Sequence, residues 1–330
     1  MNDMWIPCSV LPVFADVLTA AARIAPHAHV TPVMRSRSLD ALAGCELHFK
    51  CENVQRIGAF KFRGACNAVF ALGEAQAARG VVTQSSGNHG AAIALACRLR
   101  GIAASVVVPE GAPAVKLAAI ESYGARIVRC APNMRARDAA AAALLAETGG
   151  ALIHPFDNND VIAGQGTAAL ELLREGALDA VLTPVGGGGL LSGTAIAAQA
   201  MRGDIEVWGA EPTGAADAHA SLHDGRCITD MTAQTVCDGL RGHLAPRTFA
   251  ILRERASGIL LVEDDHTVRA MRLLWERLKV VVEPSAAVAF AAVLKHRERF
   301  EGRRVGIVLS GGNVDLDALP GLFAMASPDR

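Results

Sequence analysis

The sequence is poor in aromatic residues and has no excess of either charge. Aromatic residues make up 4% of the 330 positions, and the formal net charge is -1. Such a chain offers neither the basic surface nor the stacking platform by which proteins bind nucleic acid, so we exclude that class. No apolar run approaches the roughly 20 residues that span a bilayer. The first residues also lack the basic-then-apolar pattern of a leader, and we expect a cytoplasmic protein with no membrane partner.

Cysteines are present but are not grouped. Eight of them are dispersed along the chain, and no two are spaced as Cys-x-x-Cys. Their neighbours are mostly apolar, which predicts reduced structural thiols and not a disulfide framework or a zinc site. Hydrophobic residues make up 51% of the chain, enough to bury a large core, and we expect a compact protein of two domains.

Lysine is rare, since only five of the 32 basic residues are lysine. One of them, Lys61, lies in the aromatic and glycine-rich stretch GAFKFRG at residues 58–64. These surroundings can desolvate an amine, lower its pKa and leave room beside it for a flat ligand, as a Schiff-base lysine requires. The alternative is a lysine that snorkels from the start of an amphipathic helix.

Hydrophobic periodicity predicts alternating strands and helices. A helix at 14–24 and a strand at 46–51 open the chain, and the segment 211–238 reads as irregular. The alternation is typical of an α/β protein with parallel sheets. The other strands are expected at 80–83, 105–108, 126–130, 180–185, 205–210, 259–262 and 305–309, and the other helices at 89–99, 115–122, 134–147, 161–174, 190–201, 265–279 and 285–300.

Four consecutive glycines, Gly186, Gly187, Gly188 and Gly189, stand with Leu190 where a buried strand ends and a helix begins. Glycines let backbone N–H groups approach an anion closely, and the helix dipole assists, so we expect a phosphate to bind here. The loop lacks the Gly-Lys-Ser/Thr of a P-loop and fits G-x-G-x-x-G poorly, although Glu211 ends the next strand where a ribose-binding acid would stand. A tight turn without a ligand is the alternative.

Two further polar turns follow predicted strands. The stretch QSSGNHG at residues 84–90 offers two hydroxyls, an amide and the N-terminus of a helix, which suits a carboxylate, although Ser86 or Asn88 could simply cap that helix. The stretch LSGGN at 309–313 follows the last strand. Polar turns at the carboxyl ends of strands, with one special lysine, predict a ligand site of the kind that open α/β sheets build.

These stretches together resemble the fold-type II pyridoxal-phosphate enzymes, in the serine/threonine dehydratase and serine racemase branch. The motifs are 59–64, 85–89, AGQGT at 163–167, 186–190 and 310–313, and they follow the order of that family over roughly residues 30–315. The resemblance implies a tryptophan synthase β-like α/β fold with two domains, each a largely parallel open sheet flanked by helices. Residues 1–78 and 157–330 would form the large, cofactor-binding domain, and residues 79–156 a small mobile domain.

The resemblance also implies roles for individual residues. Lys61 would form the Schiff base with pyridoxal 5'-phosphate and move the Cα proton, and Ser86 would face it from the other side of the ring. A hydroxyl on the ring nitrogen cannot protonate it as Asp would, which favours β-elimination over transamination. The other implied contacts are Phe60 beside the ring, Gly186, Gly187, Gly188, Gly189 and Leu190 on the phosphate, Asn88 on the phenolic oxygen, Ser310 on the ring nitrogen, and Ser85, Asn88 and His89 on the substrate carboxylate.

A further match to the racemase-like branch is the stretch EPTGAAD at residues 211–217. In that branch this spacing places the carboxylates of Glu211 and Asp217 and the carbonyl of Ala215 around a divalent cation. Oxygen ligands suit Mg²⁺, with Ca²⁺ or Mn²⁺ as substitutes. A solvated acidic loop is the alternative.

The sequence therefore predicts a lyase that dehydrates L-threonine or L-serine to a 2-oxo acid and ammonia, and that acts on a small hydroxy amino acid as a homodimer. Within the family, serine racemase and threo-3-hydroxyaspartate dehydratase are the rivals. A nicotinamide-dependent oxidoreductase that uses Gly186 to Gly189 and Glu211 is a distant alternative. Neither it nor a non-catalytic binding protein requires Lys61.

Overall fold

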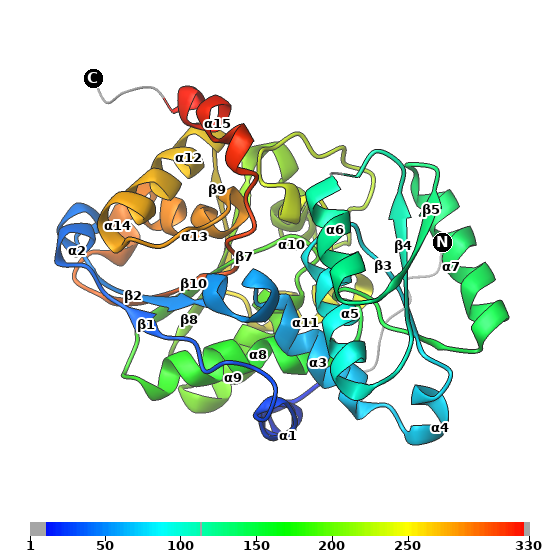
Figure 1. Cartoon of the computed structure of the whole chain (residues 1–330). Helices are drawn as coiled ribbons and strands as arrows, with labels where there is room; N and C mark the ends of the chain where they lie inside the picture. The colour runs from blue at the N-terminus through cyan, green and yellow to red at the C-terminus, as the bar shows by residue number, and fades with distance from the viewer. Residues whose placement is uncertain (1–10, 113, 327–330) are drawn as a thin grey trace.

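The computed structural model describes residues 11–112 and 114–326, and it contains two open sheets (Figure 1). The larger sheet has six strands in the order β1-β2-β10-β7-β8-β9, parallel except for the antiparallel pair β1–β2. Its strands are β1 (Val33–Met34), β2 (Glu46–Cys51), β7 (Ala180–Pro184), β8 (Glu206–Pro212), β9 (Gly258–Val262) and β10 (Arg304–Leu309).

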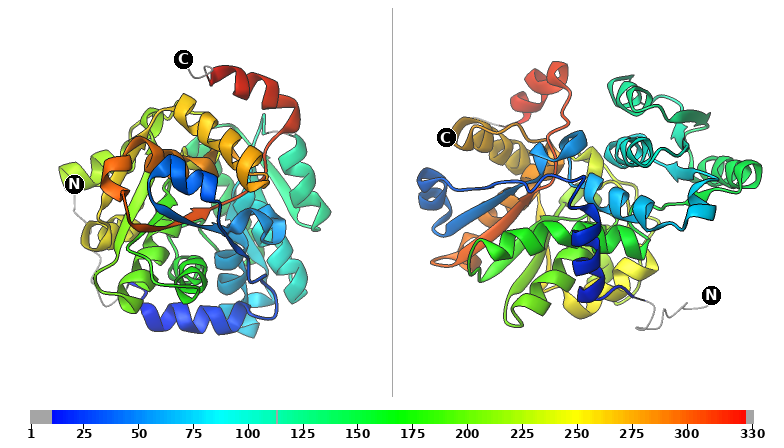
Figure 2. Two further views of the ribbon diagram at one scale, coloured as in Figure 1. Left: turned by 90° about the vertical axis from the view of Figure 1, so that its left-hand side faces the viewer. Right: turned by 60° about the horizontal axis from the view of Figure 1, so that its bottom comes forward.

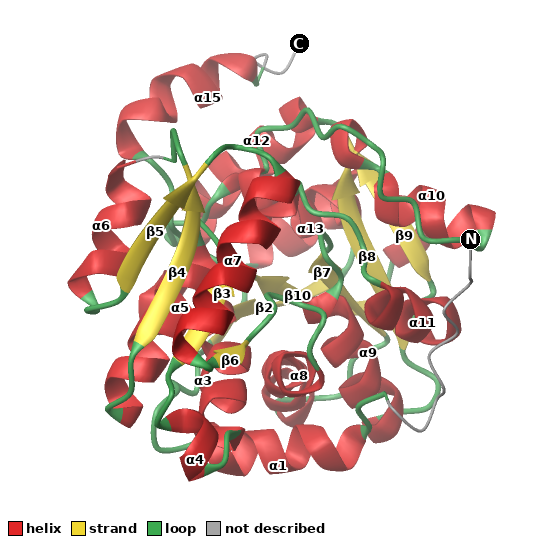
Figure 3. Cartoon of the chain, turned by 90° about the vertical axis from the view of Figure 1, so that its right-hand side faces the viewer, coloured by secondary structure: helices red, strands yellow, loops and turns green. Residues whose placement is uncertain are grey.

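The smaller sheet has four parallel strands in the order β5-β4-β3-β6. They are β3 (Val81–Gln84), β4 (Ala104–Pro109), β5 (Arg126–Cys130) and β6 (Ala151–Leu152). Figure 3 shows this sheet beside the helices of the same segment, and Figure 2 shows the cyan-to-green part of the chain gathered at one end of the molecule. The sheet lies within 79–156, whereas the domain boundaries and the mobility of that segment stay predictions.

Helices cover both sheets, and the predicted α/β class with parallel sheets is confirmed. No helix in the described ranges is long and apolar enough to cross a membrane. The helices are α1 (Phe14–Ile24), α2 (Arg37–Ala43), α3 (Lys61–Ala71), α4 (Glu74–Ala77), α5 (Asn88–Arg100), α6 (Ala114–Ser122), α7 (Met134–Thr148), α8 (Asn159–Arg174), α9 (Gly189–Met201), α10 (Asp217–Asp224), α11 (Pro246–Arg255), α12 (Asp264–Leu273), α13 (Pro284–Lys295), α14 (Arg297–Phe300) and α15 (Leu319–Met325).

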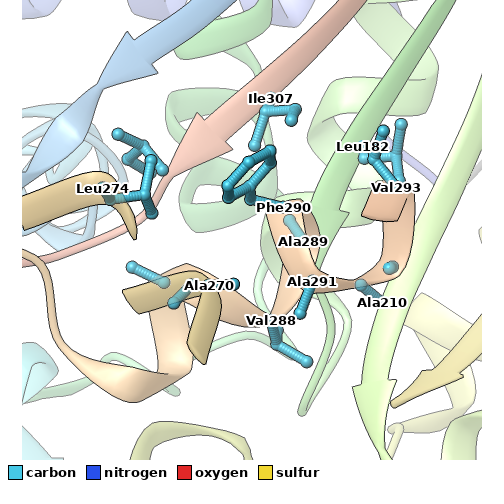
Figure 4. Close-up of a cluster of buried hydrophobic side chains, with 14 of the residues drawn as sticks. Leu182, Ala210, Ala270, Leu274, Val288, Ala289, Phe290, Ala291, Val293 and Ile307 are labelled. Carbon is cyan, nitrogen blue, oxygen red and sulfur yellow. The ribbon is translucent and has the colours of Figure 1, made fainter. Parts of the chain in front are cut away.

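The core of the larger sheet is formed around α13. Figure 4 shows Phe290 of α13 pointing toward Ile307 of β10. The Phe290 ring also meets the Phe49 ring of β2 edge to face, with centroids 5.5 Å apart. Because every residue from Pro284 to Val293 is buried, α13 has no polar face and reads in the sequence as a continuous apolar run.

Some predicted elements were wrong in detail. The segment 211–238 is not irregular throughout, because it contains the end of β8 and helix α10. The helix predicted at 285–300 breaks at His296 into α13 and α14, and the one predicted at 265–279 ends in a π-helix, Leu274–Leu278. Seven cysteines are free thiols as predicted, and Cys8 lies outside the described residues.

Helix α3 lies between the two sheets. Its apolar side chains, among them Phe62 and Val69, pack in one cluster with residues of α5 such as Ile93. Its other face meets α8, where a Cβ on Gly164 would lie 2.6 Å from the Cα of Gly64. Glycine at both positions therefore allows the two helices to approach closely.

A buried ion network fixes the polar face of α3. Arg63 has no exposed surface, and its guanidinium binds Glu52 at 2.7 and 2.8 Å and Glu171 at 2.7 and 2.8 Å. Lys50 binds the same Glu171 carboxylate at 2.5 Å. Two basic and two acidic groups thus balance inside the molecule, which avoids the large cost of an unpaired buried charge.

We predict that Glu52→Gln lowers the free energy of unfolding by about 3 kcal/mol, because it leaves the buried Arg63 guanidinium short of a counter-charge. Urea unfolding of the apoprotein measures this change. The control is Glu147→Gln, whose partner Arg126 is 57% exposed and which is 56% exposed itself. That exposed pair should contribute at most about 1 kcal/mol. Equal losses in the two variants would contradict the role given to the network.

Candidate functional site

The turn before Lys61 and the turn after β10 are held together by backbone hydrogen bonds. The Phe60 N–H donates to the Ser310 carbonyl at 2.9 Å, and the Gly312 N–H donates to the Gly58 carbonyl at 2.9 Å. Two stretches that are some 250 positions apart in the sequence, and that were predicted to share a site, are therefore in direct contact. Ser310 itself is 4% exposed.

The amine of Lys61 is directed toward a backbone carbonyl. Its Nζ donates to the Pro155 carbonyl at 3.1 Å and lies 5.1 Å from the centre of the Phe60 ring. Burial lowers the pKa of Lys61 from 10.5 to about 8. The side chain is half-buried, and its amine is held at a backbone carbonyl with a larger neutral fraction near neutral pH than an exposed lysine has.

The four glycines form the turn from β7 into α9. Gly188 has a φ of +82°, and Gly189 begins the helix. A Cβ on Gly187 would come within 2.4 Å of the Phe156 ring, and one on Gly186 would lie 3.1 Å from the Cα of Leu240. The loop is therefore closely walled by two other segments, and the backbone N–H groups at the start of α9 remain as the anion-binding feature.

The turn after β3 brings Asn88 to the same place. The Asn88 amide N–H donates to the Glu283 carboxylate at 3.1 Å, and its oxygen accepts from Asn313 at 2.9 Å. In the same turn the Ser85 hydroxyl accepts the Gly87 N–H at 3.2 Å, and Ser86 is half-buried. Asn88, Ser310 and Lys61 thus belong to one set of connected turns.

His89 is more deeply buried than its neighbours in that turn, at 2% exposure. Burial, and then the nearby Lys61 amine, hold the pKa of His89 well below its ordinary value. Its Nε2 lies 3.4 Å from the Ile153 carbonyl, and Nδ1 has no hydrogen-bond partner among the described residues. A neutral imidazole whose Nε2–H faces the Ile153 carbonyl has only a lone pair at Nδ1 and offers a carboxylate no ring donor, so the donor that His89 can offer is its backbone N–H at the start of α5.

Sequence reasoning missed Glu283 and Phe156 and gave no role to Asn313. Asn313 stood inside a motif that was already noticed, and Glu283 directly precedes Pro284 at the start of α13. An acidic residue before an N-terminal proline is also an ordinary helix start, so it carried no specific signal.

Both carboxylates of the predicted cation loop are buried. Both oxygens of Glu211 accept backbone N–H groups of α10 at 2.9 Å, from Ala218 and His219. Asp217 is 4% exposed, and its Oδ2 has no hydrogen-bond partner among the described residues. Burial raises the pKa of Glu211 to about 8 and that of Asp217 to about 6.

Within the described ranges no group of three or more His, Cys, Asp or Glu side chains is arranged to hold a metal. A cation bound by Glu211 and Asp217 would therefore need backbone oxygen, such as the buried Ala215 carbonyl, and water. The same geometry bears on the oxidoreductase alternative, because Glu211 is fully buried and already bonded to α10, so it is not available to a ribose.

Comparison with known proteins decides the family. The family described as "Pyridoxal-phosphate dependent enzyme" matches residues 24–311. The chain belongs to this family. It is a fold-type II enzyme, and the residues present fit the cofactor, since a desolvated lysine, a glycine turn at a helix N-terminus and an oriented amide lie in connected turns.

Several relatives are similar over nearly their whole length. A serine racemase of Dictyostelium discoideum is 48% identical over 92% of this chain and 95% of its own. A beta-hydroxyaspartate dehydratase of Paracoccus denitrificans is 46% identical over 94% and 99%. A solved threonine deaminase from T.th. superimposes with a TM-score of 0.88, at 46% identity over 92% of this chain and 99% of that one. The predicted branch of the family is confirmed.

We predict that Gly188→Asp weakens binding of pyridoxal phosphate by roughly tenfold or more relative to Gly188→Asn. Both variants must adopt the φ of +82° and have nearly the same shape, but only Asp places a negative charge at the start of α9. Equilibrium dialysis of the cofactor measures the difference. Equal affinities would remove the phosphate from this turn.

The lowered pKa of Lys61 predicts how the apoprotein captures its cofactor. Only the neutral amine attacks the cofactor aldehyde, so the rate of capture should rise with pH through about 8 and then level off. The control is a lysine peptide in solution, whose rate should keep rising toward the ordinary pKa near 10.4. Stopped-flow absorbance follows both reactions, and an apoprotein that behaves like the peptide would contradict the desolvated amine.

Proposed function

We propose that the protein removes water from a β-hydroxy amino acid, L-threonine or L-serine, and releases a 2-oxo acid and ammonia. The observation that carries this proposal is the Lys61 amine, whose pKa is lowered by burial and which binds the Pro155 carbonyl, next to the Phe156 ring that walls the glycine turn. The names of the similar proteins support the same class of reaction, since they include a threonine deaminase and a hydroxyaspartate dehydratase.

Pyridoxal phosphate, when bound, supplies an electron sink that makes the Cα–H bond of an attached amino acid acidic. Lys61 is the base that takes the Cα proton, because its lowered pKa leaves part of the amine neutral near pH 7. The Cβ hydroxyl then leaves with a proton as water. The released enamine becomes an imine, and its hydrolysis consumes one water, so the net products are one 2-oxo acid and one ammonia.

The surrounding residues bind and orient in this scheme. Gly186 to Gly189 and Leu190 would hold the phosphate, Ser310 would bind the ring nitrogen, and Phe60 would pack beside the ring. Ser85, Asn88 and His89 would receive the substrate carboxylate, His89 through its backbone N–H at the start of α5. The backbone hydrogen bond between Phe60 and Ser310 and the link from Asn313 to Asn88 support a common site.

Two rival activities must be assayed in parallel, because a serine racemase and a beta-hydroxyaspartate dehydratase are 48% and 46% identical to this chain. They are racemisation of serine and dehydration of threo-3-hydroxyaspartate. Purified protein should be given L-threonine, L-serine and L-threo-3-hydroxyaspartate in parallel, with a 2-oxo acid assay and chiral chromatography of the remaining amino acid. We expect a 2-oxo acid from threonine or serine and none from Lys61→Ala. Turnover of hydroxyaspartate alone, or racemisation without 2-oxo acid, would replace the proposal by the corresponding rival.

We further propose that Glu211, Ala215 and Asp217 hold a divalent cation, Mg²⁺ with Ca²⁺ or Mn²⁺ as substitutes. The burial of both carboxylates and the unpaired Oδ2 of Asp217 support it, because a cation would offset the cost of burying two acids.

If this cation binds the folded state alone, a chelator should lower the melting temperature and the activity together. Magnesium, calcium or manganese should restore both, and Asp217→Asn should no longer respond to the chelator. Differential scanning fluorimetry and the 2-oxo acid assay check this. A melting temperature that the chelator leaves unchanged would mean that Glu211 and Asp217 are buried acids that hold no cation.

Ser86 is expected to separate the two chemistries. Racemisation requires an acid–base group on each face of Cα, whereas elimination from an L-amino acid requires Lys61 alone. Ser86→Ala should therefore lose racemisation by roughly 10²–10⁴-fold while it retains much more of its L-serine or L-threonine elimination. Chiral chromatography run beside the 2-oxo acid assay measures both. Parallel loss of the two activities would mean that Ser86 only positions the loop or the carboxylate.

A further inference from the structure

The amide of Asn88 is part of a chain of hydrogen bonds that ends in an acceptor at each side. The Asn313 Nδ2 donates to the Ile57 carbonyl at 2.7 Å and to the Asn88 Oδ1 at 2.9 Å. The Asn88 Nδ2 in turn donates to Glu283, at 3.1 Å to one carboxylate oxygen and 3.5 Å to the other.

The two ends of this chain decide how both amides are turned. A backbone carbonyl accepts and never donates, so the NH₂ of Asn313 must face Ile57. The same NH₂ meets Asn88, which must present its oxygen there. A carboxylate likewise only accepts, so the NH₂ of Asn88 must face Glu283. Donation therefore starts at Asn313 and runs outward, to Ile57 on one side and through Asn88 to Glu283 on the other. Turning either amide over would place two acceptors or two donors against each other.

We propose that Glu283 and Asn313 are positioning residues that lock the Asn88 amide, so that it offers an N–H and not a carbonyl to the phenolic oxygen of the cofactor. Of the two N–H bonds on the Asn88 Nδ2, one is used by Glu283 and the other remains for the ligand. The proposal rests on the pyridoxal-phosphate site and does not depend on which amino acid is the substrate.

The backbone around this chain is shaped to hold it. Glu283 is 6% exposed, its N–H donates to the Gly311 carbonyl at 3.0 Å, and a Cβ on Gly311 would lie 2.6 Å from its carboxylate. A Cβ on Gly58 would likewise lie 2.6 Å from the Asn313 side chain. Ile57, the acceptor at the other end, has a φ of +60°, which is strained for a β-branched residue. The strained backbone of Ile57 and the two close glycine contacts therefore all lie along this hydrogen-bond chain.

The chain also crosses between the two sheets. Asn88 begins the helix that follows β3 of the smaller sheet, whereas Asn313 follows β10 of the larger sheet and Glu283 precedes α13. The amide of Asn88 is therefore oriented by Asn313 and Glu283, which both belong to the part of the chain around the larger sheet. It takes its ligand-binding orientation only while the turns around Lys61, Ser310 and Asn88 stay together.

Glu283→Gln tests the lock, because an amide at position 283 can donate as well as accept and no longer dictates how Asn88 is turned. An N–H donor stabilises the phenolate form of the cofactor bound to Lys61, which absorbs visible light, over the neutral phenol form, which absorbs in the near ultraviolet. We expect the ratio of visible to near-ultraviolet absorbance to fall by roughly tenfold and cofactor affinity to fall with it. The melting temperature of the apoprotein should change little.

The matched control is Glu263→Gln, the same chemical change in a carboxylate that is 45% exposed and bonded to Lys295 at 2.7 Å. Its absorbance ratio should equal that of the unchanged protein. If Glu283→Gln shifts the ratio no more than this control does, the lock is overturned. A purified protein that shows no cofactor absorbance before any substitution would instead overturn the proposed function.

A second variant keeps the test valid if Glu283→Gln folds poorly. Asn313 is exposed, so Asn313→Asp should fold, and its carboxylate would draw the NH₂ of Asn88 away from Glu283. We expect the same loss of visible absorbance, and Asn313→Gln, which keeps the amide, should recover part of it. An unchanged spectrum in Asn313→Asp would also refute the lock.

Discussion

The buried guanidinium of Arg63 is the interaction on which the rest of the site depends. It lies two residues after Lys61 and binds Glu52, which follows β2, and Glu171 on α8. Because a buried charge without partners costs several kcal/mol, α3 can occupy only the position in which both carboxylates are reached. The helix that carries the amine is thereby fixed to the larger sheet, while its apolar face packs on α5.

With α3 fixed, the turns of both sheets meet around one lysine. Parallel strands end at a common edge, so the turns after β7 and β10 lie together in the larger sheet, and the turn after β3 approaches from the smaller one. Hydrogen bonds from Phe60 to Ser310 and from Asn313 to Asn88 join the Lys61 turn, the turn after β10 and the turn after β3 directly. The glycines allow this close approach, because Gly187 and Gly311 leave room for Phe156 and Glu283.

The predicted cation loop, residues 211–217, is a separate unit. Like the network around Arg63, it contains buried charged groups that need partners. Glu211 caps the first amides of α10 with both oxygens, which accounts for a buried acid even before any cation is considered. The cost of burying Asp217 is not fully offset in the same way, because its Oδ2 has no hydrogen-bond partner among the described residues. That difference between the two acids is the physical reason to look for an ion there.

The sequence by itself determined most strands and long helices, the α/β class and the family, because periodicity, glycine runs and residue types are local properties, but it did not predict the elements β1, β6, α2, α4 and α11. It could not determine the content of 211–238, where α10 is short and is capped by Glu211 from the preceding strand. Nor could it show Arg63, Glu283 or Phe156 in their roles. Each acts through partners 11 to 195 positions away. Only the tertiary structure decided those contacts, since which charges pair and which way an amide faces depend on groups that folding brings together.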